Sequence, residues 1–231
     1  MALKGNTVPT GIPGFDEMLG GGFPKGSVIT VSGDTGAGKS IFASQFLYSG
    51  LTKFSEPGFY ISFDERKRLM YRNLAKFGWN FSAYEAQKKF IFIEFPIHEA
   101  SQFIAQENTM FNFIVEMGIE RVVIDPITPL AMIHPDEQKR RQELMKLINT
   151  LRSWGTTTLL VAESEDEKDI AGIGALSDGI IKLRNIDRHS YKIRAVDIVK
   201  MRGAEHAQKV CPFKITKSGI EVYPHQFVYE E

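Results

Sequence analysis

The stretch Gly33-Asp34-Thr35-Gly36-Ala37-Gly38-Lys39-Ser40 follows a β-branched run, residues 28–31, and precedes an apolar run, residues 41–43. It matches the pattern G-x-x-x-x-G-K-[ST], and its flanking residues predict the strand and the helix that this pattern requires on either side. Glycines let successive backbone N–H groups curl around a phosphate, and the helix adds the positive end of its dipole. The stretch therefore predicts a phosphate-binding loop within an α/β fold.

The two polar residues that close this loop have distinct expected roles. Lys39 should reach the β- and γ-phosphates of a nucleoside triphosphate, and the Ser40 hydroxyl should ligate Mg²⁺. The expected nucleotide contacts are the loop and the first residue after it: Gly33, Asp34, Thr35, Gly36, Ala37, Gly38, Lys39, Ser40 and Ile41. The alternative interpretation is a chance glycine turn before a helix.

Strand and helix patterns alternate along the rest of the chain. Apolar, β-rich runs predict strands at residues 58–63, 90–93, 121–125, 156–161 and 179–183. Helical patterns fall at residues 15–19, 41–47, 66–77, 108–117 and 137–154. Two late segments, residues 191–201 and 210–223, suggest antiparallel strands at the sheet edge. Such alternation indicates one α/β domain over residues 1–231, with a mostly parallel sheet covered by helices on both faces.

Composition narrows the classes of partner. The chain has 231 residues, with 28 Lys and Arg against 28 Asp and Glu, and this balance disfavours a dedicated nucleic-acid binder, which usually has a basic excess. The single cysteine, Cys211, cannot form an internal disulfide. No run approaches the 18 apolar residues of a transmembrane helix. We expect a cytoplasmic protein without membrane insertion.

Three carboxylates stand at the ends of expected strands. Asp125 ends the run at residues 121–125, where an acid that assists the magnesium ion is expected, although an Asp before Pro126 can also be a simple turn former.

Asp64 and Glu65 end the strand after the loop helix, and the carboxyl ends of parallel strands line the ligand crevice. Paired carboxylates repel, which raises the pKa of one and makes it a usable base. The alternative is an acidic N-cap for the next helix. We therefore take Asp64, Glu65 and Lys39 as the catalytic candidates and Ser40 and Asp125 as the metal candidates.

Several further segments are arranged in the same order as in KaiC-type domains, which belong to the RecA-like ATPases. The segments that carry this resemblance are residues 10–26 (TGIPGFDEMLGGGFPKG), 62–65 (SFDE), 77–79 (FGW), 121–126 (RVVIDP), 177–181 (SDGII) and 219–224 (GIEVYP). The resemblance spans about residues 8–225. It implies a RecA-like fold, ATP hydrolysis with Mg²⁺ and a homohexameric ring of single-domain subunits. A role in a circadian clock does not follow from it.

The segment 200–206 (KMRGAEH) also resembles the family. There, Lys, Arg and His at this spacing reach the ATP bound by the neighbouring subunit, which implies that Lys200, Arg202 and His206 act in trans. Cationic groups of this kind stabilise the charge on the γ-phosphate. The alternative is a solvated edge strand with protective charges.

Other functions remain open at this stage. A recombinase-type, DNA-binding ATPase shares the fold, but the equivalent loop, residues 164–172 (SEDEKDIAG), is mainly acidic and would repel phosphates. A nucleotide-gated assembly module with little turnover is a third possibility, and the protein partner is unknown. Autokinase activity of the clock type is not expected, because Gly174 and Ala175 occupy the positions where the resemblance places a hydroxyl pair, leaving only Ser177 nearby.

Overall fold

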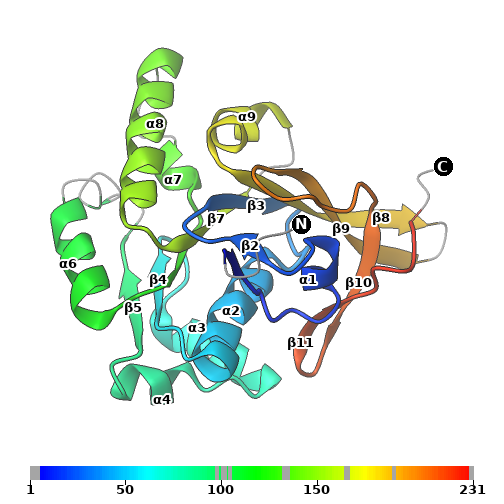
Figure 1. Ribbon diagram of the computed structural model, residues 1–231, viewed down its shortest axis with the longest axis horizontal. Coiled ribbons are helices and arrows are strands. Elements are labelled where there is room, and N and C mark those ends of the chain that lie inside the picture. Colours follow the sequence, from blue (N-terminus) through cyan, green and yellow to red (C-terminus); the bar gives the residue numbers. More distant parts are fainter. Residues whose placement is uncertain are drawn as a thin grey trace.

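A central sheet organises the computed structural model, which describes residues 6–96, 99, 103, 106–131, 136–163, 167–188 and 191–228. Within these ranges nine strands form the sheet, in the order β11-β10-β9-β8-β3-β7-β6-β4-β5 (Figure 1). A small antiparallel pair, β1 with β2, lies apart from it. The strands are β1 (Thr7–Val8), β2 (Phe23–Pro24), β3 (Val28–Gly33), β4 (Gly58–Ser62), β5 (Phe90–Glu94), β6 (Arg121–Asp125), β7 (Thr157–Glu163), β8 (Gly179–Arg188), β9 (Tyr191–Met201), β10 (Cys211–Thr216) and β11 (Gly219–Val222).

The strands from β8 to β5 run parallel, whereas β9, β10 and β11 run antiparallel to their neighbours. This confirms the predicted α/β class and the late antiparallel strands. The expected edge position is confirmed for β11, the last strand of the sheet, and is wrong for the middle of β9. β9 forms a long hairpin with β8, β10 pairs with residues 194–196 of β9, and β11 pairs with β10, so the middle of β9 lies inside the sheet. Within the described residues the end of β9 that holds Lys200 pairs with β8 alone, so the alternative of an exposed strand edge at residues 200–206 stays open.

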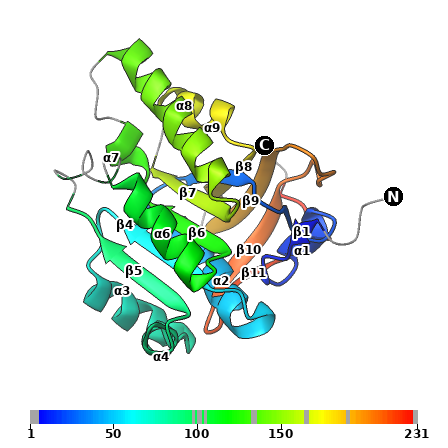
Figure 2. The same ribbon diagram turned by 60° about the vertical axis from the view of Figure 1, so that its left-hand side comes forward.

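Alternate residues of the parallel strands enter two separate apolar cores, as the pleat of a sheet requires. In β6, for example, Val123 belongs to one core and Val122 and Ile124 belong to the other. The first core is covered by α1, α2, α3 and α4, and the second by α6, α7, α8 and α9 (Figure 2). The helices therefore cover both faces, as the sequence predicts.

The helices are α1 (Phe15–Met18), α2 (Lys39–Ser49), α3 (Lys67–Leu74), α4 (Phe81–Ala86), α6 (Glu107–Met117), α7 (Thr128–Ala131), α8 (Glu137–Ser153) and α9 (Glu167–Leu176). A π-helical turn, η1 (Gly50–Phe54), extends α2, and a 3₁₀ turn, η2 (Ala75–Phe77), extends α3. The expected helix stops at Gly78, Gly118 and Gly155 are confirmed, because all three adopt positive φ. No helix in the described ranges is both long and apolar enough to cross a membrane.

A wholly buried cation anchors the far end of α2. Arg121, the first residue of β6, is 0% exposed and donates hydrogen bonds to the Glu56 carboxylate, the Phe46 carbonyl and the Pro9 carbonyl. Its guanidinium also lies over the rings of Phe46 and Phe54. Burial lowers the pKa of Arg121, and the charge of Glu56 opposes that effect. One side chain thus ties the N-terminal segment, the end of α2 and the start of β6 together.

Candidate functional site

The phosphate-binding loop connects β3 to α2. Gly33 ends β3 with φ of 143°, and a Cβ there would lie 1.9 Å from the carbonyl oxygen of Leu183 on β8. Gly36, at the tip, has φ of 75°, a left-handed conformation that glycine adopts without steric cost. The backbone N–H of Asn185 on β8 donates to the Asp34 carboxylate at 2.8 Å. The neighbouring strand therefore supports one side of the loop.

Lys39 opens α2 and is almost fully buried. Its Nζ donates to the carbonyl oxygens of Gly33 at 2.8 Å and Asp34 at 3.0 Å, so the ammonium group lies inside the loop. Burial lowers the pKa of Lys39, while the charges of Glu163 and Asp125 oppose that shift. The N-cap residue of α2 is a glycine and supplies no capping side chain. This helix end can therefore offer its first N–H groups to a phosphate.

Asp125 ends β6 and points into the site instead of closing a turn. Its Oδ2 accepts a hydrogen bond of 2.6 Å from the Tyr60 hydroxyl, and Ser40 on α2 lies close enough to the carboxylate to lower its pKa. Burial raises the pKa of Asp125, and the hydrogen bonds from Tyr60 and Ser40 and the charge of Lys39 act in the opposite direction. Three elements therefore converge on one carboxylate, which disfavours the turn-former interpretation.

Asp64 and Glu65 follow β4, whose last residue, Ser62, pairs with Asp125. The Ser62 hydroxyl donates to the Glu65 carbonyl at 2.8 Å and accepts from the Glu65 N–H at 3.1 Å, which fixes the turn. Asn73 on α3 donates to the Glu65 carboxylate at 2.9 Å. Burial raises the pKa of Glu65; the Asn73 hydrogen bond lowers it, and the charges of Asp125 and Asp64 raise it further.

The N-cap alternative for the two acids is wrong. α3 begins at Lys67, and its N-cap residue, Arg66, is in extended conformation. The Lys67 N–H donates instead to the carboxylate of Glu94, which comes from the neighbouring strand β5. Neither Asp64 nor Glu65 is therefore needed to cap this helix, and Asp64 is exposed to solvent.

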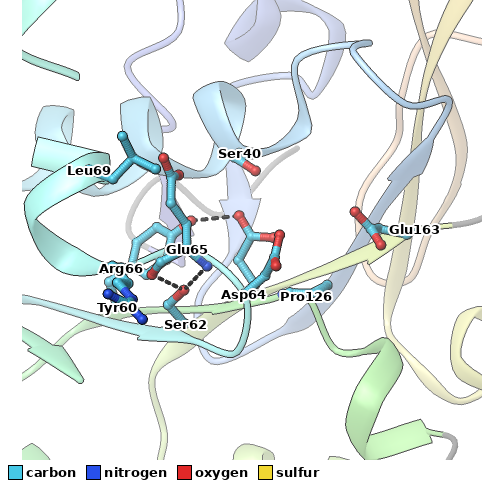
Figure 3. Close-up of a pocket in the computed structure, with 10 residues that line it drawn as sticks. Ser40, Tyr60, Ser62, Asp64, Glu65, Arg66, Leu69, Pro126 and Glu163 are labelled. Atoms are coloured by element: carbon cyan, nitrogen blue, oxygen red, sulfur yellow. Dashed lines mark hydrogen bonds between the residues drawn. The ribbon is translucent and has the colours of Figure 1, made fainter. Parts of the chain in front are cut away.

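A cavity of about 470 Å³ lies where these elements meet. Figure 3 shows Ser40, Asp64 and Glu65 on its walls, with Glu163 facing it from the opposite side. The residues that line it are Ser40, Tyr60, Ser62, Asp64, Glu65, Arg66, Leu69, Asp125, Pro126 and Glu163. The structure thus brings together the end of the loop, the acid pair and Asp125, as the sequence predicts.

Glu163 is the lining residue that the sequence did not predict. It ends β7, where it pairs with Gly33 at the start of the phosphate-binding loop. The sequence pattern predicts the end of this strand at residue 161, so Glu163 falls in an expected loop. Strand β7 lies between β3 and β6, and this position in the sheet brings Glu163 to the cavity. The local sequence around Glu163 does not indicate it.

Lys200 and Arg202, two of the residues expected to act in trans, lie near the amino ends of the parallel strands, opposite the carboxyl ends that form the cavity. Met201, between Lys200 and Arg202, pairs with Gly179, which in turn pairs with Ile29 near the start of β3. The phosphate-binding loop begins at the opposite end of β3. His206 follows on the connection from β9 to β10. The structure therefore separates Lys200 and Arg202 from the cavity of their own chain, and His206 does not line that cavity either.

Lys200 and Arg202 have partners in their own chain. Lys200 Nζ donates to the carbonyl oxygens of Gly174, Ala175 and Ser177 at 3.2, 3.3 and 2.6 Å. These carbonyls lie at and just after the carboxyl end of α9, where a cation also interacts favourably with the helix dipole. Burial lowers the pKa of Lys200, and the charge of Arg202 adds to that effect. Arg202 is exposed and lies 3.8 Å from the Asp178 carboxylate.

The segment expected to form an acidic loop is partly helical. Residues 164–166 lie outside the described residues, and residues 167–172 form the first part of α9. The sequence reading missed this helix because Gly172 and Gly174 weakened its pattern. After the helix, the Ser177 hydroxyl is buried and donates to carbonyl oxygens of its own chain, those of Gly174 and Gly179, at 3.1 and 3.0 Å.

The residues expected to hold magnesium suit that ion. Mg²⁺ takes oxygen ligands, keeps several waters and usually binds through one or two carboxylates together with substrate phosphates. Ser40 and Asp125 offer a hydroxyl and a carboxylate side by side. Within the described residues, no group of three or more His, Cys, Asp and Glu side chains could hold a metal. This donor set therefore fits a cation that arrives with a nucleotide.

Comparison with known proteins gives a consistent result. The family model described as "ATPase: KaiC" matches residues 8–227. A UPF0273 protein of Aeropyrum pernix is 34% identical over 238 residues, which cover 96% of this chain and 95% of that protein. The circadian clock oscillator protein KaiC of Prochlorococcus marinus is 33% identical over 228 residues, 94% of this chain and 46% of its own length. The chain thus spans about half the length of the clock proteins it matches.

A solved structure agrees with these matches. The crystal structure of a KaiC-like protein from Pyrococcus horikoshii has a TM-score of 0.85 and 36% identity, and the match covers 94% of this chain and 99% of that one. The resemblance found in the sequence is therefore confirmed along the whole domain. On the family model, the relatives and the fold together, the chain belongs to the KaiC family of RecA-like ATPase domains.

Proposed function

We propose that this protein binds ATP with Mg²⁺ and hydrolyses it in a site shared between neighbouring subunits of a ring, where it serves as a regulatory or motor module. The observation that carries the proposal is the convergence of the phosphate-binding loop, Asp125 and the Asp64–Glu65 pair on one cavity. Lys39 would bind the β- and γ-phosphates, and Ser40 and Asp125 would hold Mg²⁺. The ion, when bound, neutralises negative charge on the phosphate oxygens.

Glu65 is the proposed general base. It would accept a proton from water as the water oxygen attacks the γ-phosphorus and the bond from that phosphorus to the bridging oxygen breaks, giving ADP and phosphate. A raised pKa brings the carboxylate closer to the working pH, and Asn73 holds it in place. Asp64, more exposed, would help to orient the water. The charge of Glu163 raises the pKa of Asp125, although burial is the larger cause of that shift.

The distance between the two ends of β3 supports the proposal of a shared site. The six-residue strand β3 spans roughly 20 Å, so Lys200 and Arg202 at its start do not reach the phosphates bound at its end. A second subunit placed head to tail could present them there, and such a contact closes into a ring when its rotation permits. The homohexamer implied by the resemblance has this arrangement. Lys200 would exchange three backbone carbonyls for the γ-phosphate of the neighbour.

Two other functions stay as alternatives. A DNA-dependent ATPase of the recombinase type would be stimulated by single-stranded DNA, although equal numbers of acidic and basic residues do not favour it. A nucleotide-gated assembly module would bind ATP and turn it over little. ATPase assays with and without single-stranded DNA distinguish all three functions. We retain the cytoplasm as the proposed location and leave the protein partner unidentified.

The test of the proposal uses two substitutions with opposite expected patterns. Lys39→Ala should abolish ATP binding, whereas Glu65→Gln should retain ATP binding and lose hydrolysis, because the phosphate site is intact and the base is absent. Lys76→Ala and Glu116→Gln, both outside the cavity, are the matched controls and should behave as the unmodified protein. Unchanged ATP affinity in Lys39→Ala would refute the binding site, and sustained turnover in Glu65→Gln would place the base elsewhere.

A further inference from the structure

Tyr60 lies behind the candidate magnesium ligand, in the middle of β4. Its side chain enters the core covered by α2, while its sequence neighbours Phe59 and Ile61 enter the opposite core. The ring stacks on Phe92 of β5, with centroids 5.2 Å apart and planes 15° apart, and only 2% of the residue is exposed. The packing alone would be satisfied by phenylalanine. The hydroxyl therefore needs a separate explanation.

That hydroxyl has a single strong acceptor. It donates to Asp125 Oδ2 at 2.6 Å, a diagonal contact on one face of neighbouring strands, because Tyr60 pairs with Val123. On its other side lies Ser44, one helical turn after Ser40 on α2. The Ser44 hydroxyl is buried and has no hydrogen-bond partner among the described residues. Burial and the charge of Asp125 raise the pKa of Tyr60, and Ser44 acts weakly in the opposite direction.

We propose that Tyr60 is a positioning residue for magnesium: its hydroxyl fixes Oδ2 of Asp125 so that the other carboxylate oxygen is presented to the cation beside Ser40. This inference rests on the proposed function and deepens it. A terminal carboxylate rotates freely about its last bond, and a charge-assisted hydrogen bond to one oxygen removes that freedom before the ligand arrives. The gain concerns binding of the cation and leaves the contacts between the loop and the nucleotide unchanged.

The chain offers a matched control on the other side of the same aromatic cluster. Tyr71 on α3 also donates its hydroxyl to a carboxylate, that of Glu85, at 3.1 Å, and its ring also contacts Phe92, edge-on at 5.8 Å. Neither Tyr71 nor Glu85 lines the cavity. Tyr71→Phe therefore removes the same kind of hydrogen bond from the same cluster, away from the site.

The experiment measures the dissociation constant of a non-hydrolysable ATP analogue by calorimetry, once in excess Mg²⁺ and once in EDTA. The ratio of the two constants is the tightening due to the metal. We expect Tyr60→Phe to reduce this ratio about tenfold, which corresponds to about 1.4 kcal/mol, with the constant in EDTA unchanged. Tyr71→Phe should keep the ratio of the unmodified protein. In an Asp125→Asn background, Tyr60→Phe should have no further effect, because the group that it positions is altered.

The outcomes separate the inference from the function on which it rests. If Tyr60→Phe has the same ratio of dissociation constants in EDTA and in Mg²⁺ as the unmodified protein, the role of Tyr60 is overturned and the proposed ATPase function is unaffected. Equal weakening with and without Mg²⁺ also overturns it, because the hydroxyl would then act on the loop structure. If the unmodified protein shows no tightening by Mg²⁺, the proposed magnesium site itself fails.

Discussion

Replacing Arg121 by methionine should lower the free energy of unfolding by about 3–5 kcal/mol, the cost of breaking a buried ion pair by removing one partner. The substitution leaves three acceptors without their donor: the Glu56 carboxylate and the carbonyls of Phe46 and Pro9. Stranded buried groups cost about 1–3 kcal/mol each, which sums to about 3–9 kcal/mol. Glu56 is 19% exposed and can recover water, which favours the lower half of that range. Methionine retains much of the apolar contact with Phe46 and Phe54.

Urea titration followed by circular dichroism measures this loss. In a chain of this size 1 kcal/mol corresponds to about 2–4 °C, so the melting temperature should fall by about 6–20 °C. Adding Glu56→Met to the Arg121→Met protein should recover part of the stability, because the unpaired carboxylate is then absent. Lys192→Met, which breaks an exposed pair with Asp187, is the control and should cost less than about 1 kcal/mol. An Arg121→Met protein no less stable than this control would refute the reasoning.

Three further predictions concern the site. ATPase activity should fall on acidification through a pKa above the ordinary glutamate value, because burial raises the pKa of Glu65 and a protonated base cannot accept a proton. Asn73→Ala removes a hydrogen bond that lowers this pKa, so it should move the acid limb of the pH–kcat profile to higher pH. An acid limb at the same pH in Asn73→Ala would contradict this prediction. Glu65→Gln and Arg202→Ala proteins, each inactive alone, should regain activity when mixed, because some interfaces then combine an intact Glu65 with an intact Arg202. The loss of an arginine acting in trans costs about 10³–10⁵ in rate, and full activity of single subunits at high dilution would exclude sharing. Mass spectrometry after incubation with labelled ATP should find no stoichiometric phosphate at Ser177, because its hydroxyl is buried and donates to the Gly174 carbonyl; such a phosphate would refute the expectation.

Local sequence signals predicted much of the site because it is built from strand ends. Gly33–Ser40 could be recognised from spacing alone, and Asp125 and the acids 64 and 65 follow apolar runs whose ends are clear. Glu163 was missed because β7 continues through Ala162 past the last β-branched residue of its run. Tyr60 was missed because a tyrosine within a buried strand has the same pattern as a core phenylalanine. Its role depends on a contact between two strands, which no local pattern records.

The ends of helices were predictable where the helical spacing of apolar residues stops at a glycine, as at Gly118 after α6 and Gly155 after α8. The fold was not predictable where tertiary contacts decide the local conformation. At Gly50, where the π-helical turn after α2 begins, a Cβ would lie 2.5 Å from the Arg121 side chain, so a residue distant in the sequence restricts this position to glycine. The position of β9 inside the sheet depends on two strands that follow it, and α9 has glycines within it.

Gly33 and Gly36 belong to one sequence motif but meet two different requirements. A side chain at Gly33 would overlap the Leu183 carbonyl whether or not a nucleotide is present, so this position is constrained by the spacing of β3 and β8. At Gly36 an added Cβ would meet no heavy atom of the described residues within 4 Å, so within the chain itself it is the left-handed backbone that favours glycine. For protein engineering, asparagine, which tolerates left-handed backbone, is an admissible choice at Gly36. Position 33 tolerates no residue with a side chain, because the close approach of β8 excludes a Cβ there whether or not a ligand is bound.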